Sequence, residues 1–427
     1  MFCIIHHYYL YLFRELIDSL LTVIHQARLY MFNLLNGLKI IDLTSIVLGP
    51  YATKILGDLG ADVIKVEPLV GDLFRTVRPG HPEQMGAGFI NCNRNKKSIS
   101  INLKEPEGKL ALIELIGTAD VFVHNMRPSS IERLGLSYDE LIKTNPELVY
   151  CFSAGFGQDG PYKDDPAYDD IAQAMSGLAF LNANAEGEPR YLPTIIGDKV
   201  SGLHLALAVL AAVTNRLQTG NGCYIEAPMF ESMVSFLMVE QLAGQSFEPP
   251  LGGIGYERLL SPNRKPFRTL DGYISILPYN SKDWTSFLTL IDRTDISNAE
   301  WVTNSVLRSK NIDQLYKIIS DATSKQTTKQ WLESLKTLDI PCSEVKRMDE
   351  LLSDPHLQEV NFFHESDHPT EGRLRSVRSP FRVRGFKEYE DKSAPALGED
   401  TINVLQNAGL ELDRIKELEL NGIIRTS

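Results

Sequence analysis

The stretch PTIIGDKVSGLHLALAVLAAVTN, residues 193–215, joins a short apolar segment to a long apolar helical pattern. Residues 194–196 predict the end of a short buried strand, and Gly197 permits a sharp turn that a side chain would resist. A helix starting there places Asp198 at or next to the N-cap, where its carboxylate meets free N–H groups and the positive end of the helix dipole. The stretch therefore predicts a strand-to-helix turn that presents one carboxylate.

Asp198 has two interpretations. An acidic residue before an apolar helix is most often a helix cap. An ionised carboxylate held at a strand-to-helix turn can also attack an acyl group and form a covalent intermediate. The local sequence does not choose between a cap and a nucleophile.

Composition sets the class of protein and excludes some partners. The 427 residues, 43% hydrophobic and 23% charged, are enough for two globular domains. A net charge of -12, without a Lys/Arg-rich block, predicts no nucleic-acid partner. The five cysteines are scattered and contain no CxxC pair, so we expect neither a disulfide framework nor a metal site. These features favour a cytoplasmic location.

Residues 1–30 differ from the rest of the chain. They are apolar and aromatic, but Arg14, Glu15, Asp18 and Arg28 make them too polar for a membrane span. A basic start and a small-residue cleavage site, which a signal peptide needs, are not evident. We predict an N-terminal extension outside the fold and no membrane partner.

The next segment has the pattern of a βαβ unit. Strands are predicted at 38–43 and 61–67, with a helix at 51–60 between them. The loop before the helix carries only Gly49, so the dinucleotide fingerprint is missing, although Glu67 stands where a ribose-binding acid would be expected. A helix beginning at Tyr51 could still receive a phosphate or a carbonyl oxygen.

Basic residues gather at the ends of the elements predicted next. The ends of strands and helices are where an α/β sheet presents ligand contacts, so the cluster favours an anionic ligand. A solvated surface on an acidic protein is the other interpretation. The cluster consists of Arg94, Lys96, Lys97, Lys104, Arg127 and Arg133.

A change of composition marks a domain boundary. Residues 246–269 are rich in Gly, Pro and Arg without sustained periodicity, which is typical of a linker or an active-site lid. A lid would depend on Gly252, Gly253 and Gly255 for its freedom to move. We expect a large Rossmann-like domain at 31–245, to which residues 345–427 return, and a smaller α+β domain at 270–344.

Many blocks of the chain, in one order, resemble the class III CoA-transferases. This family, of the formyl-CoA transferase and CaiB-BaiF type, is related to the α-methylacyl-CoA racemases. The resemblance extends from about Leu35 to Leu418. The blocks include LNGLKIIDLTSIVLGPYATKILGDLGADVIKVEP, NKKSISINLKEPEG, HNMRPSSIERLG, AYDDIAQAMSGL, IIGDKVSGLH, TGNGCYIEAPMFES, GIGYER, DIPCSEV, DPHLQ and APALGEDT.

The resemblance implies an α/β fold in an interlocked homodimer and CoA transfer between an acyl-CoA and a carboxylic acid. No cofactor is implied, because coenzyme A enters as part of the acyl-CoA substrate. Asp198 falls on the family's nucleophile, which forms a mixed anhydride with the donor acyl group and then a thioester with CoA. An anhydride is easily hydrolysed, so a lid at 252–255 would exclude water.

Two alternatives stand beside the transferase. The related racemases carry a histidine where this chain has Tyr168, and tyrosine, with an ordinary pKa near 10, is a poor base for α-proton abstraction. This exchange favours the transferase over a 2-methylacyl-CoA racemase. Asp169 matches an acidic position of the transferases, which implies a supporting role in the site. A non-catalytic acyl-CoA-binding protein with the same fold is the second alternative.

The resemblance also implies binding residues. Val47 replaces a substrate-facing glutamine, and Pro68 replaces an arginine near the adenine, for which Arg75 or Lys97 would compensate. These departures disfavour oxalate and formate. A small dicarboxylic acceptor would be held by Arg258, Arg264 and Arg268. The positions that correspond to CoA contacts are Val47, Ile101, Lys104, Asn125, Met126 and Arg133.

Overall fold

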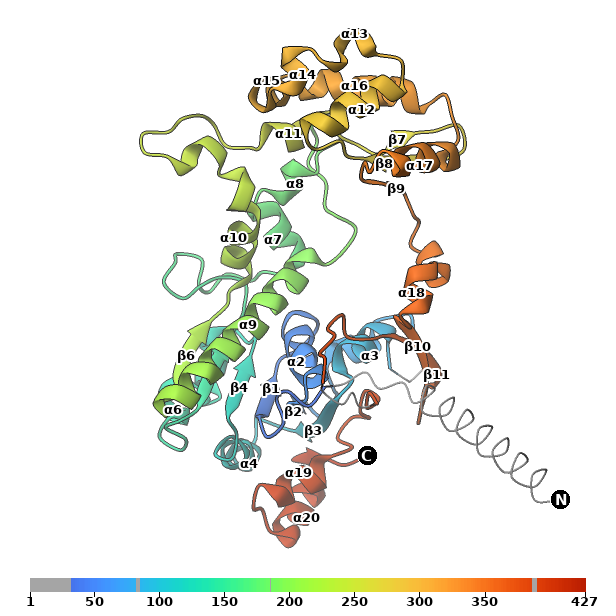
Figure 1. The fold of residues 1–427 in the computed structure, drawn as a ribbon. Coiled ribbons are helices and arrows are strands. Elements are labelled where there is room, and N and C mark those ends of the chain that lie inside the picture. Colours follow the sequence, from blue (N-terminus) through green and yellow to red (C-terminus); the bar gives the residue numbers. More distant parts are fainter. Residues whose placement is uncertain (1–31, 82–84, 185, 386–389) are drawn as a thin grey trace, which may run out of the picture. The chain divides into compact units, whose positions relative to one another are not determined.

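The chain forms two compact units, which Figure 1 colours along the sequence. The computed structural model describes residues 32–81, 85–184, 186–385 and 390–427. The first unit consists of residues 32–176, 192–234 and 361–427, and the second of 177–191 and 235–360. The predicted extension at 1–30 lies outside the described residues, and the predicted limits at 245 and 344 stay predictions.

The first unit is built on a seven-stranded sheet in the order β12-β3-β2-β1-β4-β5-β6. Neighbouring strands are parallel except β12, which pairs antiparallel with β3. The order 3-2-1-4-5-6 is that of the Rossmann fold, so the predicted α/β fold is confirmed. The strands are β1 (Lys39–Leu43), β2 (Asp62–Glu67), β3 (Lys96–Ile101), β4 (Val121–His124), β5 (Val149–Phe152), β6 (Cys223–Glu226) and β12 (Ile424–Arg425).

Helices cover both faces of this sheet, so the central strands β1, β2 and β3 are buried on both sides. One face packs against α4, α5, α6, α19 and α20 through a core that includes Ile41, Leu112 and Leu405. On the other face, α9 packs against α2, β5 and β6. The helices of this unit are α2 (Leu48–Asp58), η1 (Leu73–Thr76), α3 (Ala87–Asn93), α4 (Pro106–Ile116), α5 (Pro128–Arg133), α6 (Tyr138–Leu141), α7 (Asp169–Met175), α9 (Ile196–Thr219), α19 (Thr401–Asn407) and α20 (Leu412–Leu420).

Helix α2 begins three residues before the predicted start at Tyr51. Pro50 is compatible with the first helical turn, where its missing N–H has no helical partner to lose. A Cβ on Gly49 would lie 2.3 Å from the Cβ of Thr44, so the glycine lets the preceding loop fold tightly onto the helix. Gly49 therefore serves close packing in this structure.

The prediction of a strand at 194–196 is wrong. These residues form no strand, Thr194 and Ile195 are exposed, and Ile195 is the N-cap of α9. A three-residue run without a neighbouring strand has nothing to pair with, and the helix begins directly at Ile196. Asp198 is thus the third residue of α9 rather than its cap.

Helix α9 is also the one helix, within the described ranges, that is long and apolar enough to cross a membrane by length and composition. Half of its most apolar 18-residue window is buried inside the structure. Because the buried side contacts α2 and the sheet, these features are typical of the core helix of a globular domain.

The second unit contains an antiparallel sheet in the order β7-β8-β9. Its core gathers Trp284 of α12, Leu315 of α16 and Trp331 of α17. The elements are α8 (Leu178–Leu181), η2 (Ala243–Ser246), α11 (Glu257–Leu260), β7 (Phe267–Arg268), β8 (Tyr273–Ile276), α12 (Ser281–Leu290), α13 (Thr294–Ser297), α14 (Glu300–Thr303), α15 (Ser305–Lys310), α16 (Ile312–Thr323), α17 (Thr328–Thr337), β9 (Cys342–Glu344), η3 (Glu350–Ser353) and α18 (Pro355–Glu359).

The glycine-rich segment at 246–269 folds back on the end of α10 (Met229–Gln241). The N–H of Gly255 donates to the carbonyl of Gln241 at 2.8 Å, and the side chain of Gln245 donates to the carbonyl of Gly252 at 2.7 Å. Gly244 and Gly253 are joined by a backbone hydrogen bond of 3.2 Å. The segment is therefore a hydrogen-bonded loop, and its role as a lid stays a prediction.

The C-terminal tail, residues 361–427, belongs to the first unit. Within the tail, β11 (Gly372–Val377) pairs antiparallel with β10 (Phe363–His368). After α20, the sequence pattern predicts no further element, but Ile424 and Arg425 add the edge strand β12. Two residues are too few to show an alternating pattern.

Candidate active site

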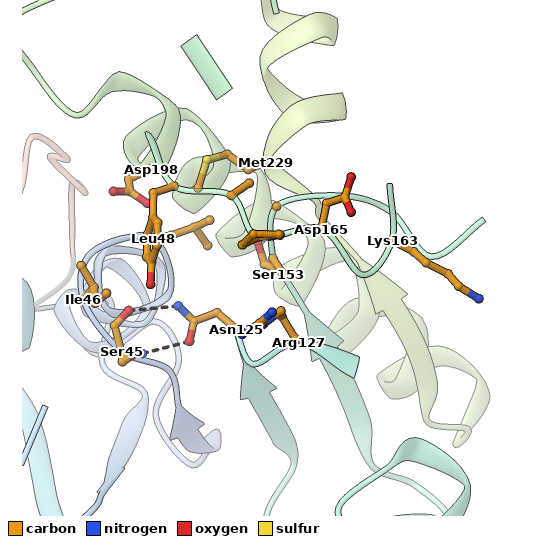
Figure 2. A pocket seen from close by; sticks show the side chains of 15 residues that line it. Ser45, Ile46, Leu48, Asn125, Arg127, Ser153, Lys163, Asp165, Asp198 and Met229 are labelled. Carbon is orange, nitrogen blue, oxygen red and sulfur yellow. Dashed lines mark hydrogen bonds between the residues drawn. The ribbon is translucent and has the colours of Figure 1, made fainter. Parts of the chain in front are cut away.

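A cavity of about 200 Å³ opens at the carboxyl ends of β1, β4 and β5 (Figure 2). The strand order reverses between β1 and β4, which is where open α/β sheets bind their ligands. Ser45 follows β1, Asn125 follows β4 and Ser153 follows β5. The lining residues are Ser45, Ile46, Leu48, Asn125, Arg127, Ser153, Ala154, Gly155, Lys163, Asp165, Pro166, Ala167, Tyr168, Asp198 and Met229.

Asn125 joins the ends of the two central strands. Its Oδ1 accepts a hydrogen bond from the N–H of Ser45, and its Nδ2 donates to the carbonyl of Ser45, both at 3.0 Å (Figure 2). Both groups of the amide are therefore used to hold the loop after β1. Asn125, predicted as a CoA contact, lines the cavity while it fixes this loop.

Asp198 faces the same cavity from the first turn of α9. Burial, and then the negative charge of the neighbouring Asp169, raise the pKa of Asp198 to about 7. A helix N-terminus favours a negative charge, but here burial and the like charge outweigh it. Among the described residues, no cation lies within ion-pair distance of the Asp198 carboxylate.

Asp169 supports Asp198 directly. It is the first residue of α7 and is buried. Its Oδ1 accepts a hydrogen bond from the backbone N–H of Asp198 at 3.1 Å. This contact fixes the spacing of the two acids, so that one carboxylate acts on the pKa of the other.

Gln173 is a residue of the site that the sequence pattern did not reveal. Its Nε2 donates to Oδ2 of Asp169 at 2.7 Å, and its Oε1 accepts from the N–H of Leu192 at 2.9 Å. Nε2 also lies 3.3 Å from the carbonyl of Thr194. Gln173 thus ties α7 to the segment that enters α9. Its spacing of four residues from Asp169 on one helix was the available signal.

Gly197 has a different role from the predicted turn. It is helical and buried, and a Cβ there would lie 3.1 Å from Oδ1 of Asp169 and 3.4 Å from Sδ of Met229. The absence of a side chain therefore lets α7 and the start of α10 approach Asp198.

The other predicted residues of the first unit are divided between the cavity and its surroundings. Tyr168 is the N-cap of α7, is 68% exposed and lines the cavity. Val47 is buried and does not line it, whereas its neighbours Ile46 and Leu48 do. Ile101 is buried in the core beneath α4. Outside the cavity, Met126 is half-buried, and Lys104 and Arg133 are exposed.

The two residues predicted to compensate for Pro68 are engaged elsewhere. Lys97 pairs with Asp62 at 2.7 Å on the surface. Arg75 is buried, and its Nε and one terminal nitrogen each donate to Glu67 at 2.7 Å. Glu67 is thus a buried ion-pair partner, and its interpretation as a free ribose-binding acid is wrong. The predicted contacts of Arg75 and Lys97 with CoA stay predictions.

Two cations line the cavity in addition to the implied CoA contacts: Arg127, a member of the predicted basic cluster, and Lys163. Arg127 lies beside Asn125 after β4, and Lys163 lies on the loop that leads to α7. Figure 2 shows Lys163 extending outward, away from Asn125 and Asp198. A Gly/Pro-rich loop has no periodic pattern that would predict which of its side chains face a cavity.

The three arginines predicted for an acceptor carboxylate belong to the second unit. Arg258 donates to the hydroxyl of Tyr316 at 3.0 Å and lies over the ring of Tyr279 at 5.4 Å. Arg264 and Arg268 are exposed. Their contact with an acceptor, like the roles of Gly252, Gly253 and Gly255, stays a prediction.

The described ranges contain no group of three or more His, Cys, Asp or Glu side chains placed to hold a metal ion. The chemistry that the cavity offers is that of an uncompensated carboxylate. A carboxylate with a raised pKa, facing a cavity, can act as a nucleophile or as a general base.

Comparison with known proteins extends over the same residues. The model of the family described as CoA-transferase family III matches residues 35–401. The chain is 33% identical to the succinyl-CoA:glutarate CoA-transferase of Homo sapiens, covering 91% of this chain and 90% of the relative. It is 30% identical to the formyl-CoA:oxalate CoA-transferase of Rhodopseudomonas palustris, covering 92% and 98%, and to the succinyl-CoA:mesaconate CoA-transferase of Haloarcula marismortui, covering 88% and 97%.

A solved structure agrees with these sequence matches. The crystal structure of a CAIB/BAIF family protein from Brucella suis has a TM-score of 0.72 and 28% identity, covering 88% of this chain and 99% of that protein. The parallel sheet, with a cavity where its strand order reverses, and the sequence relatives lead to the same family assignment. The chain belongs to CoA-transferase family III and is a CoA-transferase.

Proposed function

We propose that this enzyme moves CoA from an acyl-CoA to a small carboxylic acid through covalent intermediates on Asp198. The observation that carries the proposal is the environment of this carboxylate: it faces the cavity, lies next to Asp169 and lacks a cationic partner among the described residues. A structural carboxylate is normally paired or capped. An acid held without compensation is more typical of a reactive group.

The steps follow from the chemistry of an acyl carrier. An oxygen of Asp198 attacks the thioester carbon, the carbon–sulfur bond breaks, and the CoA thiolate departs. A mixed anhydride between Asp198 and the donor acyl group remains. The thiolate then attacks the aspartyl carbonyl, which releases the donor as a carboxylate and leaves an aspartyl-CoA thioester. The acceptor carboxylate attacks this thioester and expels the thiolate again. Attack of the thiolate on the acceptor carbonyl gives the new acyl-CoA and restores Asp198.

The raised pKa suits this reaction. With a pKa of about 7, a substantial fraction of Asp198 is ionised at neutral pH. Such a carboxylate is more basic than an exposed one, and nucleophilic reactivity rises with basicity. The bond from the N–H of Asp198 to Asp169 keeps the group in place without neutralising it.

We further propose that the acceptor is a dicarboxylic acid. Three relatives are named for glutarate, oxalate and mesaconate. Arg127 lines the cavity and offers a planar pair of donors that suits a second carboxylate. Val47 and Pro68 still disfavour oxalate itself. A panel of succinyl-CoA and acetyl-CoA against mono- and dicarboxylates would identify the preferred pair.

We propose a cytoplasmic, interlocked homodimer as the working form. Helix α9 exposes Leu203 and Leu207, by 47% and 64%, one helical turn apart. Exposed apolar side chains at this spacing suit a partner surface. The four described cysteines are free thiols, as is usual in a reducing compartment. Light scattering combined with size-exclusion chromatography should give twice the mass of the chain.

Trapping by hydroxylamine tests the reaction at Asp198. Wild-type enzyme incubated with succinyl-CoA and hydroxylamine should form a hydroxamate on the peptide that contains Asp198, detected by mass spectrometry. The isosteric Asp198→Asn variant is the matched control and should form none. No adduct with any acyl-CoA would favour a non-catalytic binding protein. Racemisation of a 2-methylacyl-CoA without an acceptor would favour a racemase.

A further inference from the structure

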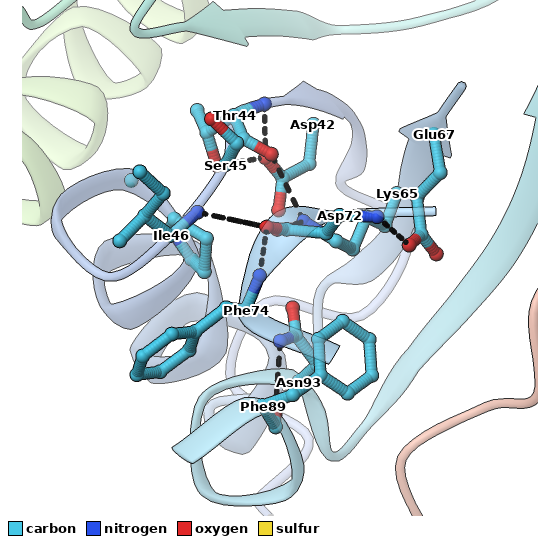
Figure 3. A network of polar contacts seen from close by, with 12 residues as sticks. Asp42, Thr44, Ser45, Ile46, Lys65, Glu67, Asp72, Phe74, Phe89 and Asn93 are labelled. Carbon is cyan, nitrogen blue, oxygen red and sulfur yellow. Dashed lines mark hydrogen bonds and ion pairs between the residues drawn. The ribbon is translucent and has the colours of Figure 1, made fainter. Parts of the chain in front are cut away.

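The loop after β1, residues 44–46, holds an unfavourable backbone conformation at the cavity (Figure 3). Ile46 has a φ of +70°, in the left-handed region that β-branched residues rarely adopt. Its neighbours Ser45 and Leu48 line the cavity with it. A conformation of this kind persists only where the surroundings impose it.

Asp72 imposes it on Ile46. The backbone N–H of Ile46 lies 3.2 Å from each oxygen of the Asp72 carboxylate. The same carboxylate accepts from the N–H of Phe74 at 3.0 Å, which fixes its plane (Figure 3). Asp72 is only 4% exposed, so water does not compete for these bonds.

Lys65 orients Asp72 in turn. This residue of β2 is fully buried, and its Nζ donates to Oδ2 of Asp72 at 2.8 Å and to the carbonyl of Thr44 at 2.9 Å. Burial alone would lower the pKa of Lys65, but Asp72 and the neighbouring carboxylates raise it, so the lysine is a cation. One ammonium group thus holds both ends of the loop, directly at Thr44 and through Asp72 at Ile46.

The loop is coupled to the helix that carries Asp198. Helix α9 packs on the first turn of α2, where a Cβ on Gly202 would lie only 2.7 Å from the carbonyl oxygen of Leu48. A shift of Ile46 would therefore move Leu48 against α9, because the contact leaves no free space. The loop that forms a wall of the cavity and the helix that carries the proposed nucleophile therefore both adjoin the first turn of α2.

Stability alone does not explain why a buried ion pair lies at this place. Burying two charges costs desolvation, and such pairs are often no better than apolar residues of similar volume. Asp58 offers an internal comparison: it is also buried and pairs with Lys54 and Arg94 at 2.7 and 2.8 Å, but these ion pairs do not involve residues 44–46.

We propose that Asp72, oriented by Lys65, is a positioning residue for the transfer reaction. It acts through Ile46, whose left-handed conformation keeps the loop that forms the cavity wall in a fixed position relative to Asp198. This inference rests on the proposed reaction at Asp198. It assigns no contact between Asp72 and the substrate.

The test compares Asp72→Asn with Asp58→Asn, using a substrate pair that the wild-type enzyme turns over. The amide introduced by Asp72→Asn would keep one acceptor oxygen but turn an NH₂ group toward the Lys65 ammonium, so Ile46 should lose its fixed conformation. We expect kcat to fall about 10- to 100-fold, because small displacements of reacting groups have effects of this size. Asp58→Asn should change kcat by less than about threefold.

A glycine at position 46 separates positioning from stability. Glycine adopts positive φ without strain, so the Ile46→Gly background does not need Asp72 to hold the loop. There, Asp72→Asn should lower kcat by less than about threefold. An equal loss of kcat in both backgrounds would overturn the proposal, because the two residues would then act independently.

Hydrogen exchange gives a readout that does not depend on activity. A peptide covering residues 44–50 should exchange faster in Asp72→Asn than in the wild type, and not in Asp58→Asn. Unchanged exchange, or faster exchange with an unchanged kcat, would overturn the positioning role alone. A wild-type enzyme that transfers CoA to no acid and forms no adduct at Asp198 would overturn the proposed function, and the positioning role with it.

Discussion

Two pairs of acids in the first unit face opposite electrostatic surroundings. Asp42 and Asp72 lie among lysines: burial would raise the pKa of Asp42, but Lys96, Lys65 and two hydroxyl groups lower it to about 2. Asp198 has Asp169 as its charged neighbour, and burial and that charge together raise its pKa to about 7. Asp42 is thus fully ionised at neutral pH, whereas Asp198 is about half-protonated there.

The difference shows that burial by itself does not assign a role to an acid. What separates the two regions is the presence of cations, and these come from neighbouring strands. The ion pair of Asp42 with Lys96 belongs to the core of the fold, whereas Asp198 lacks a cationic partner among the described residues, as is typical of a reactive group. The following changes would break or sharpen this contrast.

The largest effect on activity is expected from a change at Asp198, which lies beside Asp169 without a cationic partner among the described residues. Asp198→Asn keeps the shape of the side chain but removes the proposed nucleophile, so transfer of CoA should fall by at least about 10⁴-fold. Steady-state assays with succinyl-CoA and the best acceptor measure this loss. Circular dichroism should show an unchanged fold. A variant that retains a tenth of the wild-type rate would exclude Asp198 as the nucleophile.

Breaking the ion pair of Asp42 with Lys96 should lower the stability of the fold. Asp42→Asn leaves the fully buried Lys96, which lies 3.0 Å from Asp42, without its counter-charge. We expect the free energy of unfolding to fall by about 3–5 kcal/mol, the usual result of breaking a buried ion pair. Urea denaturation measures it. Lys97→Met, which removes the exposed partner of Asp62, is the control and should cost less than about 1 kcal/mol.

Removing the neighbouring charge should shift the pH dependence of the reaction. The proposed nucleophile, Asp198, must be ionised to react, so kcat/KM should fall as pH decreases through about 7. Asp169→Asn removes a negative charge that raises the pKa of Asp198, so this acid limb should move to lower pH. Rates between pH 5 and 9 measure it. A limb that stays in place would show that burial alone sets the pKa.

The smallest effect should be a gain in stability. Asp198 has a pKa near 7 in the folded chain against an ordinary value of 3.8, so its contribution to stability is lost as pH rises from about 4 to 7. Asp198→Asn avoids this loss and should raise the Tm at pH 8 by about 2 °C. The gain should shrink as the pH falls toward 5. Scanning calorimetry at both pH values checks the sign.

The sequence predicted the elements better than their ends. Apolar runs placed β1 and β2, and helical periodicity placed α2, because each pattern is repeated over several residues. The strand at 194–196 failed because three residues carry no such repeat. Asp198 itself was singled out by its place before a helix, and its proposed role came from the resemblance to a family.

Gln173 and the Lys65–Asp72 pair could not be read from the sequence as parts of the site. Gln173 has an ordinary helical position, and its meaning depends on the segment at 192–194 that folds beside it. Lys65 is one basic residue within a strand, where a surface position would be the usual expectation. Its burial is compensated by Asp72 at 2.8 Å and by the carbonyl of Thr44 at 2.9 Å.

The sequence by itself determined the apolar strands and helices, the acidic surface and the family, since these depend on which residues follow one another. Only the tertiary structure decided which carboxylates are neutralised. Asp42 meets Lys96 from 54 positions away because β1, β2 and β3 lie side by side in the sheet. Asp198 meets Asp169 because α7 begins beside the first turn of α9. Charge compensation depends on distance in space, which the order of residues does not state.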